Sequence, residues 1–185
     1  MDARIDNNKY KFLNINNLEE VISTKEIELR VKSIGREISE TYCDKIPIII
    51  GVLNGAFIFM ADLVRALDIK YEVDFIKIGS YGNKMKSSGN IKLIKDISSL
   101  IQGRHVIIVE DIIDSGLSIT FLKEHIEKGK PESLKIVAFL YKSNVSKIDF
   151  KIDWVGYEID NRYFVGYGLD YKQLFRGLTG IYAIN

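Results

Sequence analysis

The chain has 185 residues, of which 46% are hydrophobic, and its 26 lysines and arginines nearly balance its 25 aspartates and glutamates. This length is typical of one domain with a proper core, and the balanced charge creates no field that would favour nucleic acid or an anionic membrane. No apolar run approaches the length of a membrane span, and the first residues lack the basic-then-apolar order of a signal peptide. We therefore expect a cytoplasmic protein without a nucleic-acid or membrane partner.

The cysteine and histidine content is low. The single cysteine, Cys43, cannot form an internal disulfide, and we interpret it as a packing residue. One cysteine and two histidines also argue against a Cys/His zinc site. These counts agree with a reducing compartment.

The first predicted helix follows a polar segment. Residues 1–22 are rich in asparagine, and we interpret them as an N-terminal arm or a short edge element. The stretch Ser23–Glu26 has the spacing of a capping box, which predicts that a helix begins there. Apolar residues then recur at intervals of three and four, which predicts one buried helix face. They are Ile27, Val31, Ile34, Ile38 and Tyr42.

A strand, a glycine turn and a second helix are predicted next. Pro47–Leu53 is a fully apolar run typical of a buried strand, and Gly55 follows it. Gly55 would let a backbone approach a ligand closely, although most such glycines serve only the turn. The run Phe57–Leu67 then predicts a helix. Its expected inward-facing residues are Phe57, Met60, Ala61, Val64 and Leu67.

Two further runs, 73–80 and 91–97, predict a pair of strands that flank a polar loop. The loop begins at Ser80 and Tyr81 and is rich in serine, glycine and lysine. Long polar loops in compact domains are often lids over a ligand, and the alternative is a solvated hairpin tip.

The segment 105–120 carries the most chemical information. Its start, Val106–Val109, is an unbroken apolar run of the kind found in strands buried on both faces of a parallel sheet. The carboxylates Glu110, Asp111 and Asp114 follow directly. The hydroxyl-rich run Ser115–Thr120 then leads into a helical pattern.

A strand that ends in acids and turns into a helix has a specific chemical use. The first N–H groups of the helix have no backbone partner, and together with the helix dipole they favour an anion. Carboxylates would repel a phosphate directly, so their presence indicates sugar hydroxyls or Mg²⁺ between them. We interpret the segment as a site for a phosphorylated sugar. The alternative is an acidic strand end followed by an ordinary helix cap.

The remaining elements complete an α/β pattern. Leu134–Tyr141 predicts another strand, and Lys142 stands at its carboxyl end, where ligands collect in open α/β sheets. Lys142 is therefore a binding candidate or a solvated strand end. From residue 153 the chain becomes strand-rich and dense in aromatics. We predict one α/β domain over residues 1–185, with a mainly parallel central sheet flanked by helices and a small β-rich hood over residues 153–185.

The run Val109–Thr120 resembles the signature of the type I phosphoribosyltransferases, in the form carried by hypoxanthine-guanine phosphoribosyltransferases. Four further matches follow in the family's order: Leu53–Gly55, Ser80–Gly82, Lys142, and the run Val165–Tyr171 with Arg176. The resemblance implies the fold of that family with a flexible lid loop. It also implies a purine salvage enzyme that converts 5-phosphoribosyl 1-diphosphate and hypoxanthine or guanine into IMP or GMP and diphosphate, with Mg²⁺ as cofactor.

The resemblance also implies roles for the matched residues around the activated sugar. Asp114 would be the catalytic base at purine N7, and Glu110 and Asp111 would meet the ribose hydroxyls directly or through Mg²⁺. Asp170 would hold a second Mg²⁺. The 5′-phosphate and diphosphate would be bound by Leu53, Asn54, Gly55, Ser115, Gly116, Leu117, Ser118, Thr120 and Arg176, with a cis peptide between Leu53 and Asn54 and a lid formed by Ser80 and Tyr81.

The purine site is implied by a second group of residues. Lys142 would donate to the 6-oxo group and disfavour adenine, because an ammonium only donates. Tyr163 would stack on the base, Phe164 would supply main-chain contacts, and Asp170 would also border the purine. Tyr163 stands where the family often has phenylalanine, so its hydroxyl could shift the preference among guanine, hypoxanthine and xanthine.

Two other functions remain open. One is a non-catalytic regulator on the same fold that senses 5-phosphoribosyl 1-diphosphate, and the other is a xanthine-preferring phosphoribosyltransferase. The resemblance further implies a homodimer or homotetramer, because members of the family form both.

Overall fold

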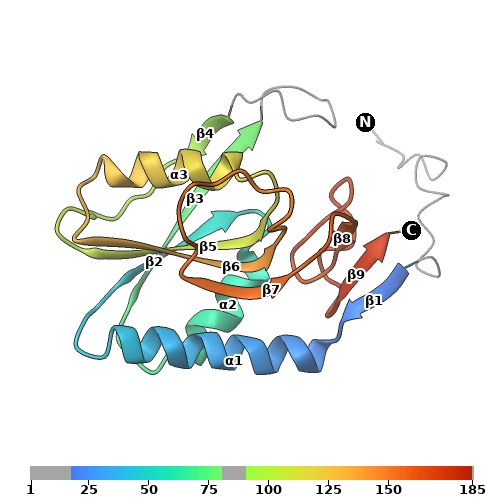
Figure 1. Cartoon of the computed structure of the whole chain (residues 1–185). Helices are drawn as coiled ribbons and strands as arrows, with labels where there is room; N and C mark the ends of the chain where they lie inside the picture. The colour runs from blue at the N-terminus through green and yellow to red at the C-terminus, as the bar shows by residue number, and fades with distance from the viewer. Residues whose placement is uncertain (1–17, 81–90, 185) are drawn as a thin grey trace, which may run out of the picture.

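The computed structural model describes residues 18–80 and 91–184, which form two sheets and three helices (Figure 1). The larger sheet has six strands in the order β4-β3-β2-β5-β6-β7. All neighbouring pairs are parallel except β3 and β4, which are antiparallel. Its strands are β2 (Ile48–Leu53), β3 (Glu72–Ser80), β4 (Ile91–Lys95), β5 (His105–Ile113), β6 (Ser133–Tyr141) and β7 (Trp154–Glu158). The predicted mainly parallel α/β sheet is confirmed.

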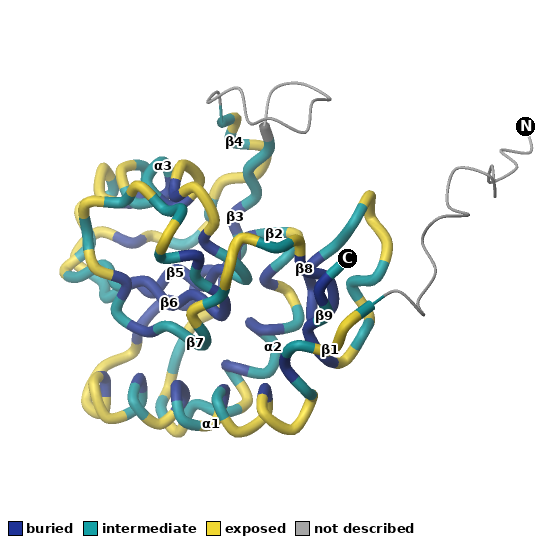
Figure 2. Tube along the Cα trace, turned by 45° about the vertical axis from the view of Figure 1, so that its right-hand side comes forward, coloured by how far each residue is buried: buried dark blue, intermediate teal, exposed yellow. Residues whose placement is uncertain are grey.

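The helices cover both faces of this sheet, with α1 (Thr24–Thr41) and α2 (Phe57–Ala66) on one face and α3 (Leu117–Glu127) on the other (Figure 1). Successive residues of β5 point to opposite faces, as strand geometry requires. Ile107 belongs to the core under α1 and α2, and Ile108 belongs to the core under α3. Figure 2 shows β5 and β6 buried at the centre of the molecule. The apolar run was therefore read correctly as a strand buried on both faces.

The start of α1 follows the predicted capping box. The backbone N–H of Ser23 donates to Glu26 Oε2 at 2.9 Å, and the backbone N–H of Glu26 donates to Ser23 Oγ at 3.4 Å. This exchange satisfies N–H groups that the first helical turn leaves free. The predicted inward face is confirmed, because Ile27, Val31, Ile34, Ile38 and Tyr42 are all buried.

One packing prediction is partly wrong and another is wrong. On α2, Met60 is buried and Val64 and Leu67 are partly buried against the core, as expected, but Phe57 is 44% exposed and Phe59 and Leu63 are buried instead. Nearly every position of this helix is apolar, so the sequence does not single out one face. Cys43 is exposed rather than packed, because it follows the last turn of α1 and lies outside the core.

The hood is a three-stranded antiparallel sheet in the order β1-β9-β8. Its strands are β1 (Leu18–Ile22), β8 (Tyr163–Val165) and β9 (Ile181–Ile184). The predicted start of the hood is wrong, because β7 belongs to the large sheet, where it covers the outer edge of the apolar strand β6. The end of the predicted arm forms β1, an edge strand of the hood, which agrees with the alternative of a short edge element. The hood therefore begins after Glu158 and uses both ends of the described chain.

Neither α1, α2 nor α3 is long and apolar enough to cross a membrane. The predicted lid residue Ser80 is the last residue of β3 and pairs with Ile91. Tyr81 and the rest of the predicted lid lie outside the described residues, as do residues 1–17.

One buried carboxylate anchors the segment that follows β4. Asp74 on β3 accepts backbone N–H groups from Phe75 at 2.7 Å, Ser98 at 2.6 Å and Ser99 at 2.8 Å. Burial acts to raise the pKa of Asp74, but the three N–H groups outweigh burial and lower the pKa to about 2. Ionised Asp74 therefore stabilises the fold above pH 4, and the contribution is lost as the pH falls towards 2.

The substitution Asp74→Asn should lower the free energy of unfolding at pH 7 by about 2 kcal/mol, because the neutral amide accepts these N–H groups less strongly. The difference from wild type should shrink as the pH falls from 4 towards 2. Urea unfolding across this pH range measures both effects. Asp68→Asn, at an exposed position, is the control and should change stability little at any pH. A constant deficit at every pH would contradict the ionic origin.

Candidate active site

The central strand β5 contains two of the predicted acids and ends just before the third. Glu110 and Asp111 lie within β5, which extends to Ile113 rather than stopping at the acids. Asp114 follows in the turn before α3. Gly116 closes this turn with φ of +88°, and a Cβ there would lie 2.5 Å from Ile148 Cγ2. The turn therefore requires glycine.

The turn opens a small cavity at the start of α3. The backbone N–H of Thr120 donates to the Gly116 carbonyl at 3.0 Å, which begins the helical hydrogen bonds. The cavity has a volume of about 220 Å³. Its lining residues are Glu110, Ile112, Ile113, Asp114, Ser115, Gly116, Ser118 and Ile119. A cavity lined by hydroxyls and by the first N–H groups of a helix suits a bound phosphate group.

A neighbouring segment supports the turn from outside. The backbone N–H of Lys142 donates to the Ile113 carbonyl at 3.0 Å, and the backbone N–H of Lys147 donates to the Ser115 carbonyl at 3.1 Å. The segment after β6 therefore holds both ends of the turn between β5 and α3. Nothing in the sequence pattern indicated this support.

The acids of β5 are held in an electrostatically unfavourable place. Burial raises the pKa of Glu110 well above its ordinary value, and the adjacent Asp111 charge raises it further. Burial also raises the pKa of Asp111, against the opposing effect of backbone hydrogen bonds and of Arg176. Two neighbouring carboxylates that are shielded from solvent favour the binding of a cation. Such a cation can lie between these carboxylates and a bound ligand. Their oxygens are donors that fit Mg²⁺.

The loop after β2 touches Asp111 directly. The peptide bond between Leu53 and Asn54 is cis, as the resemblance implied. A Cβ on Gly55 would lie 1.7 Å from Asp111 Oδ2, so any larger residue at this position would force the Asp111 side chain or the loop to move. Gly168 approaches from the other side, since its Cβ would lie 2.0 Å from the Gly55 carbonyl oxygen. The loop 53–55 is thus held between β5 and the hood.

Lys142 lies at the carboxyl end of β6 and is buried. Its side chain is 6% exposed, and its Nζ lies 3.1 Å from Asp114 Oδ2. The alternative interpretation as a solvated strand end is therefore wrong. Asp114 is 53% exposed, so part of its carboxylate remains open to a ligand. The pair joins the predicted base-selecting residue to the predicted catalytic residue.

The hood contributes an aromatic ring and an ion pair. Tyr163 is 53% exposed, meets Tyr171 edge-on with ring centroids 5.5 Å apart, and donates through its hydroxyl to the Asp170 carbonyl at 3.3 Å. Arg176 Nη2 lies 2.6 Å from Asp170 Oδ1, and Arg176 Nη1 donates to the Gly168 carbonyl at 2.7 Å. Phe164 is the middle residue of β8 and is buried.

Comparisons with known proteins agree with this geometry. The family profile described as a phosphoribosyl transferase domain matches residues 17–172. The chain is 46% identical to the hypoxanthine-guanine phosphoribosyltransferase of Bacillus subtilis over 87% of this chain and 89% of that protein. The chain belongs to the phosphoribosyltransferase family. The predicted family is confirmed.

Solved structures of this phosphoribosyltransferase family share the fold. A hypoxanthine-guanine phosphoribosyltransferase from Bacillus anthracis superposes with a TM-score of 0.86 at 38% identity, covering 90% of this chain and 98% of that one. A hypoxanthine phosphoribosyltransferase from Trypanosoma cruzi, solved with its product IMP, gives a TM-score of 0.85 at 33% identity, covering 93% and 97%. The predicted type I phosphoribosyltransferase fold is confirmed.

The structure brings most predicted site residues of this phosphoribosyltransferase together. Contacts connect Asp111 to Gly55, Asp114 to Lys142, and Arg176 to Asp170. Two contributors received no role in the sequence interpretation. Gly168 packs on the loop 53–55, and Tyr171 holds the Tyr163 ring edge-on. Both belong to the quoted run 165–171, but a motif match does not show which neighbour each residue contacts.

The substitution Gly55→Ala should lower phosphoribosyltransferase activity by roughly a hundredfold or more, because the added methyl group forces Asp111 or the loop to move by an ångström or more. Steady-state kinetics checks this, with circular dichroism to show that the fold is retained. Gly177→Ala is the matched control, since a Cβ at Gly177 meets nothing within 4 Å. Equal activity of the two variants would show that the close contact between Gly55 and Asp111 is not needed for activity.

Proposed function

We propose that this phosphoribosyltransferase transfers the phosphoribosyl group of 5-phosphoribosyl 1-diphosphate to N9 of hypoxanthine or guanine, giving IMP or GMP and diphosphate. One observation carries the proposal. The buried ammonium of Lys142 lies 3.1 Å from Asp114, and Asp114 also lines the cavity at the start of α3. A group suited to a 6-oxo purine therefore adjoins a pocket suited to a sugar phosphate. The names of the similar proteins support the same reaction.

In the proposed reaction, the bond between C1 of ribose and the diphosphate oxygen breaks, and both electrons leave with diphosphate. N9 of the purine then forms a bond to C1, and the proton on N7 passes to Asp114. Positive charge grows on the sugar and negative charge grows on the leaving group, so fixed charges and positioning matter more than a nucleophile. The 5′-phosphate would be held by the N–H groups and hydroxyls from Ser115 to Thr120.

Mg²⁺ is the proposed cofactor. Glu110 and Asp111 would hold one ion together with the ribose hydroxyls, and Asp170 would hold a second near the diphosphate. When bound, Mg²⁺ offsets the negative charge of the diphosphate. Within residues 18–80 and 91–184, no three His, Cys, Asp or Glu side chains converge on one point, so the substrate would supply many of the oxygens. Arg176 would add a cation beside the diphosphate.

Selection of the base would depend on Lys142 and Tyr163. The ammonium donates to a 6-oxo group and offers no acceptor for the 6-amino group of adenine. The half-exposed ring of Tyr163 would stack on the purine, with main-chain contacts from Phe164. The Tyr163 hydroxyl already donates to the Asp170 carbonyl, which supports a role in orienting the ring.

Three further parts of the proposal have the family resemblance as their main support. The loop from Ser80 and Tyr81 would close over the site and exclude water, which competes with the purine for the activated sugar. The protein would act in the cytoplasm. It would also assemble as a homodimer or homotetramer.

A panel of adenine, hypoxanthine, guanine and xanthine tests the proposed function. With 5-phosphoribosyl 1-diphosphate and Mg²⁺, hypoxanthine and guanine should be converted, adenine should not, and excess chelator should stop turnover. Lys142→Ala should lower the hypoxanthine-over-adenine ratio of kcat/KM by roughly a hundredfold or more. Lys147→Ala, at an exposed lysine nearby, should leave the ratio unchanged. Conversion of none of the four bases by wild type would refute the function, and an unchanged ratio in Lys142→Ala would refute the mode of selection.

Asp114→Asn should reduce kcat by roughly 10²- to 10⁴-fold, because the amide cannot take the N7 proton. The KM for 5-phosphoribosyl 1-diphosphate should change little, since the cavity N–H groups remain. Initial-rate kinetics with each substrate varied separates the two effects. Asp149→Asn, at an exposed aspartate in the segment after β6, is the control. A parallel loss in kcat and in affinity for the sugar would make Asp114 a binding residue.

A further inference from the structure

The backbone turn 166–168 of the hood lies against the loop 53–55. Gly168 has φ of +102°, and a Cβ there would lie 2.0 Å from the Gly55 carbonyl oxygen. Because Gly55 in turn touches the Asp111 carboxylate, any shift of the turn 166–168 is passed to that loop. The contacts that hold this turn in position therefore affect the geometry of the proposed diphosphate site.

Tyr167 is the side chain that anchors the turn. Its φ of +49° is one that non-glycine residues seldom adopt, so surrounding contacts must hold it. The ring is 5% exposed and packs against Phe139 with centroids 5.0 Å apart. The backbone N–H donates to the Leu178 carbonyl at 2.8 Å, and the hydroxyl donates to Asp62 Oδ2 at 2.8 Å. Burial and the bond to Asp62 raise the pKa of Tyr167, so the hydroxyl remains a donor at neutral pH.

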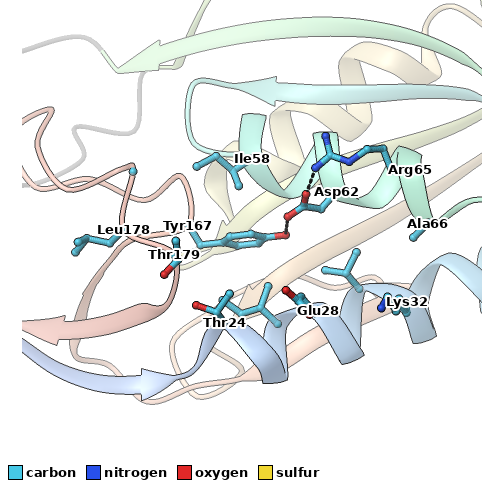
Figure 3. Close-up of a pocket in the computed structure, with 13 residues that line it drawn as sticks. Thr24, Glu28, Lys32, Ile58, Asp62, Arg65, Ala66, Tyr167, Leu178 and Thr179 are labelled. Carbon is cyan, nitrogen blue, oxygen red and sulfur yellow. Dashed lines mark hydrogen bonds and ion pairs between the residues drawn. The ribbon is translucent and has the colours of Figure 1, made fainter.

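The tyrosine reaches across to α2 in the wall of a cavity of about 510 Å³ (Figure 3). Figure 3 shows the Tyr167 hydroxyl pointing at Asp62, which also forms an ion pair with Arg65 one turn further along α2. The Arg65 side chain is 71% exposed and lies on the far side of Asp62 from the hood. Of these two contacts of the Asp62 carboxylate, only the one with Tyr167 connects α2 to the hood.

The helix α2 is continuous with the loop that the hood covers. The backbone N–H of Ala56 donates to the Val52 carbonyl at 3.2 Å, and the backbone N–H of Phe57 donates to the Asn54 carbonyl at 3.3 Å. Loop and helix therefore form one unit. The hood contacts this unit at Gly55 through Gly168 and at Asp62 through Tyr167. Two points of attachment, unlike one, resist rotation of the loop against the hood.

We propose that Tyr167 and Asp62 are positioning residues for the loop 53–55, acting through Gly168 rather than by touching a ligand. The inference rests on the proposed function for its kinetic consequence, because that loop would bind the diphosphate. Neither residue lines the cavity at the start of α3. Loss of the hydrogen bond should weaken use of 5-phosphoribosyl 1-diphosphate more than use of the purine, because Tyr163 is also held by the pairing of β8 with β9.

The decisive variant is Tyr167→Phe, which keeps the ring packed on Phe139 and removes only the hydroxyl. The KM for 5-phosphoribosyl 1-diphosphate should rise roughly five- to tenfold, which corresponds to the net contribution of one ordinary hydrogen bond. The KM for hypoxanthine should stay within twofold. Amide hydrogen exchange in the segment 52–60 should accelerate by a similar factor, and this second readout does not depend on any activity.

A set of Asp62 variants tests the partner. Asp62→Ala should reproduce Tyr167→Phe, and the double variant should be no worse than either single one. Asp62→Asn keeps an acceptor oxygen and should restore much of the wild-type KM. Arg65→Ala controls for loss of the ion pair and should behave as wild type in both readouts.

The outcomes separate this inference from the proposed function. A wild-type protein without transferase activity would refute the function, while hydrogen exchange would still test the positioning role. If Tyr167→Phe leaves exchange in segment 52–60 at the wild-type rate, the positioning role is refuted. Equal increases in the KM for both substrates would also overturn it, because they would indicate a general loosening of the fold.

Discussion

The contact between Gly55 and the Asp111 carboxylate is the constraint on which the site depends. The parallel strands β2 and β5 pair as far as Gly51 and Val109, which brings the loop after β2 against the acids of β5. An acid placed there is buried, and this burial raises the pKa of Glu110 and of Asp111. The absence of a side chain on Gly55 leaves room for Asp111. Any larger residue would move either the charge or the loop.

The hood contributes to the site at two places in one short segment of the chain. Tyr163 presents its ring at the start of β8, and the turn 166–168 packs on the loop after β2. Arg176 connects the two by bonding both the Gly168 carbonyl and the Asp170 carboxylate. A small sheet can therefore fix a base-stacking ring and a backbone turn relative to each other. The distance between the proposed purine and diphosphate sites is then set by the hood as well as by the large sheet.

Local sequence patterns predicted much of this molecule, because periodicity and capping depend on neighbouring residues. The buried run of β5, the capping box at Ser23 and the turn into α3 were all predictable in this way. The buried face of α2 was not, since nearly every position there is apolar. The contact of Tyr167 with Asp62 joins residues 105 positions apart, so no local sequence pattern predicts it. The placement of β7 likewise depends on the open edge of β6, which only the assembled sheet reveals.

The pairing of Leu18 with Ile184 places strands from the two ends of the described chain side by side in the hood. During synthesis on the ribosome, the large sheet has all its strands once Glu158 has emerged, and it can begin to fold. The hood cannot form until β9 is free, because β9 is the middle strand between β1 and β8. The acids of β5 are therefore in place before the turn that covers the neighbouring loop. A nascent chain can therefore bury the core of the large sheet early and gain competence for ligands only after β9 has emerged.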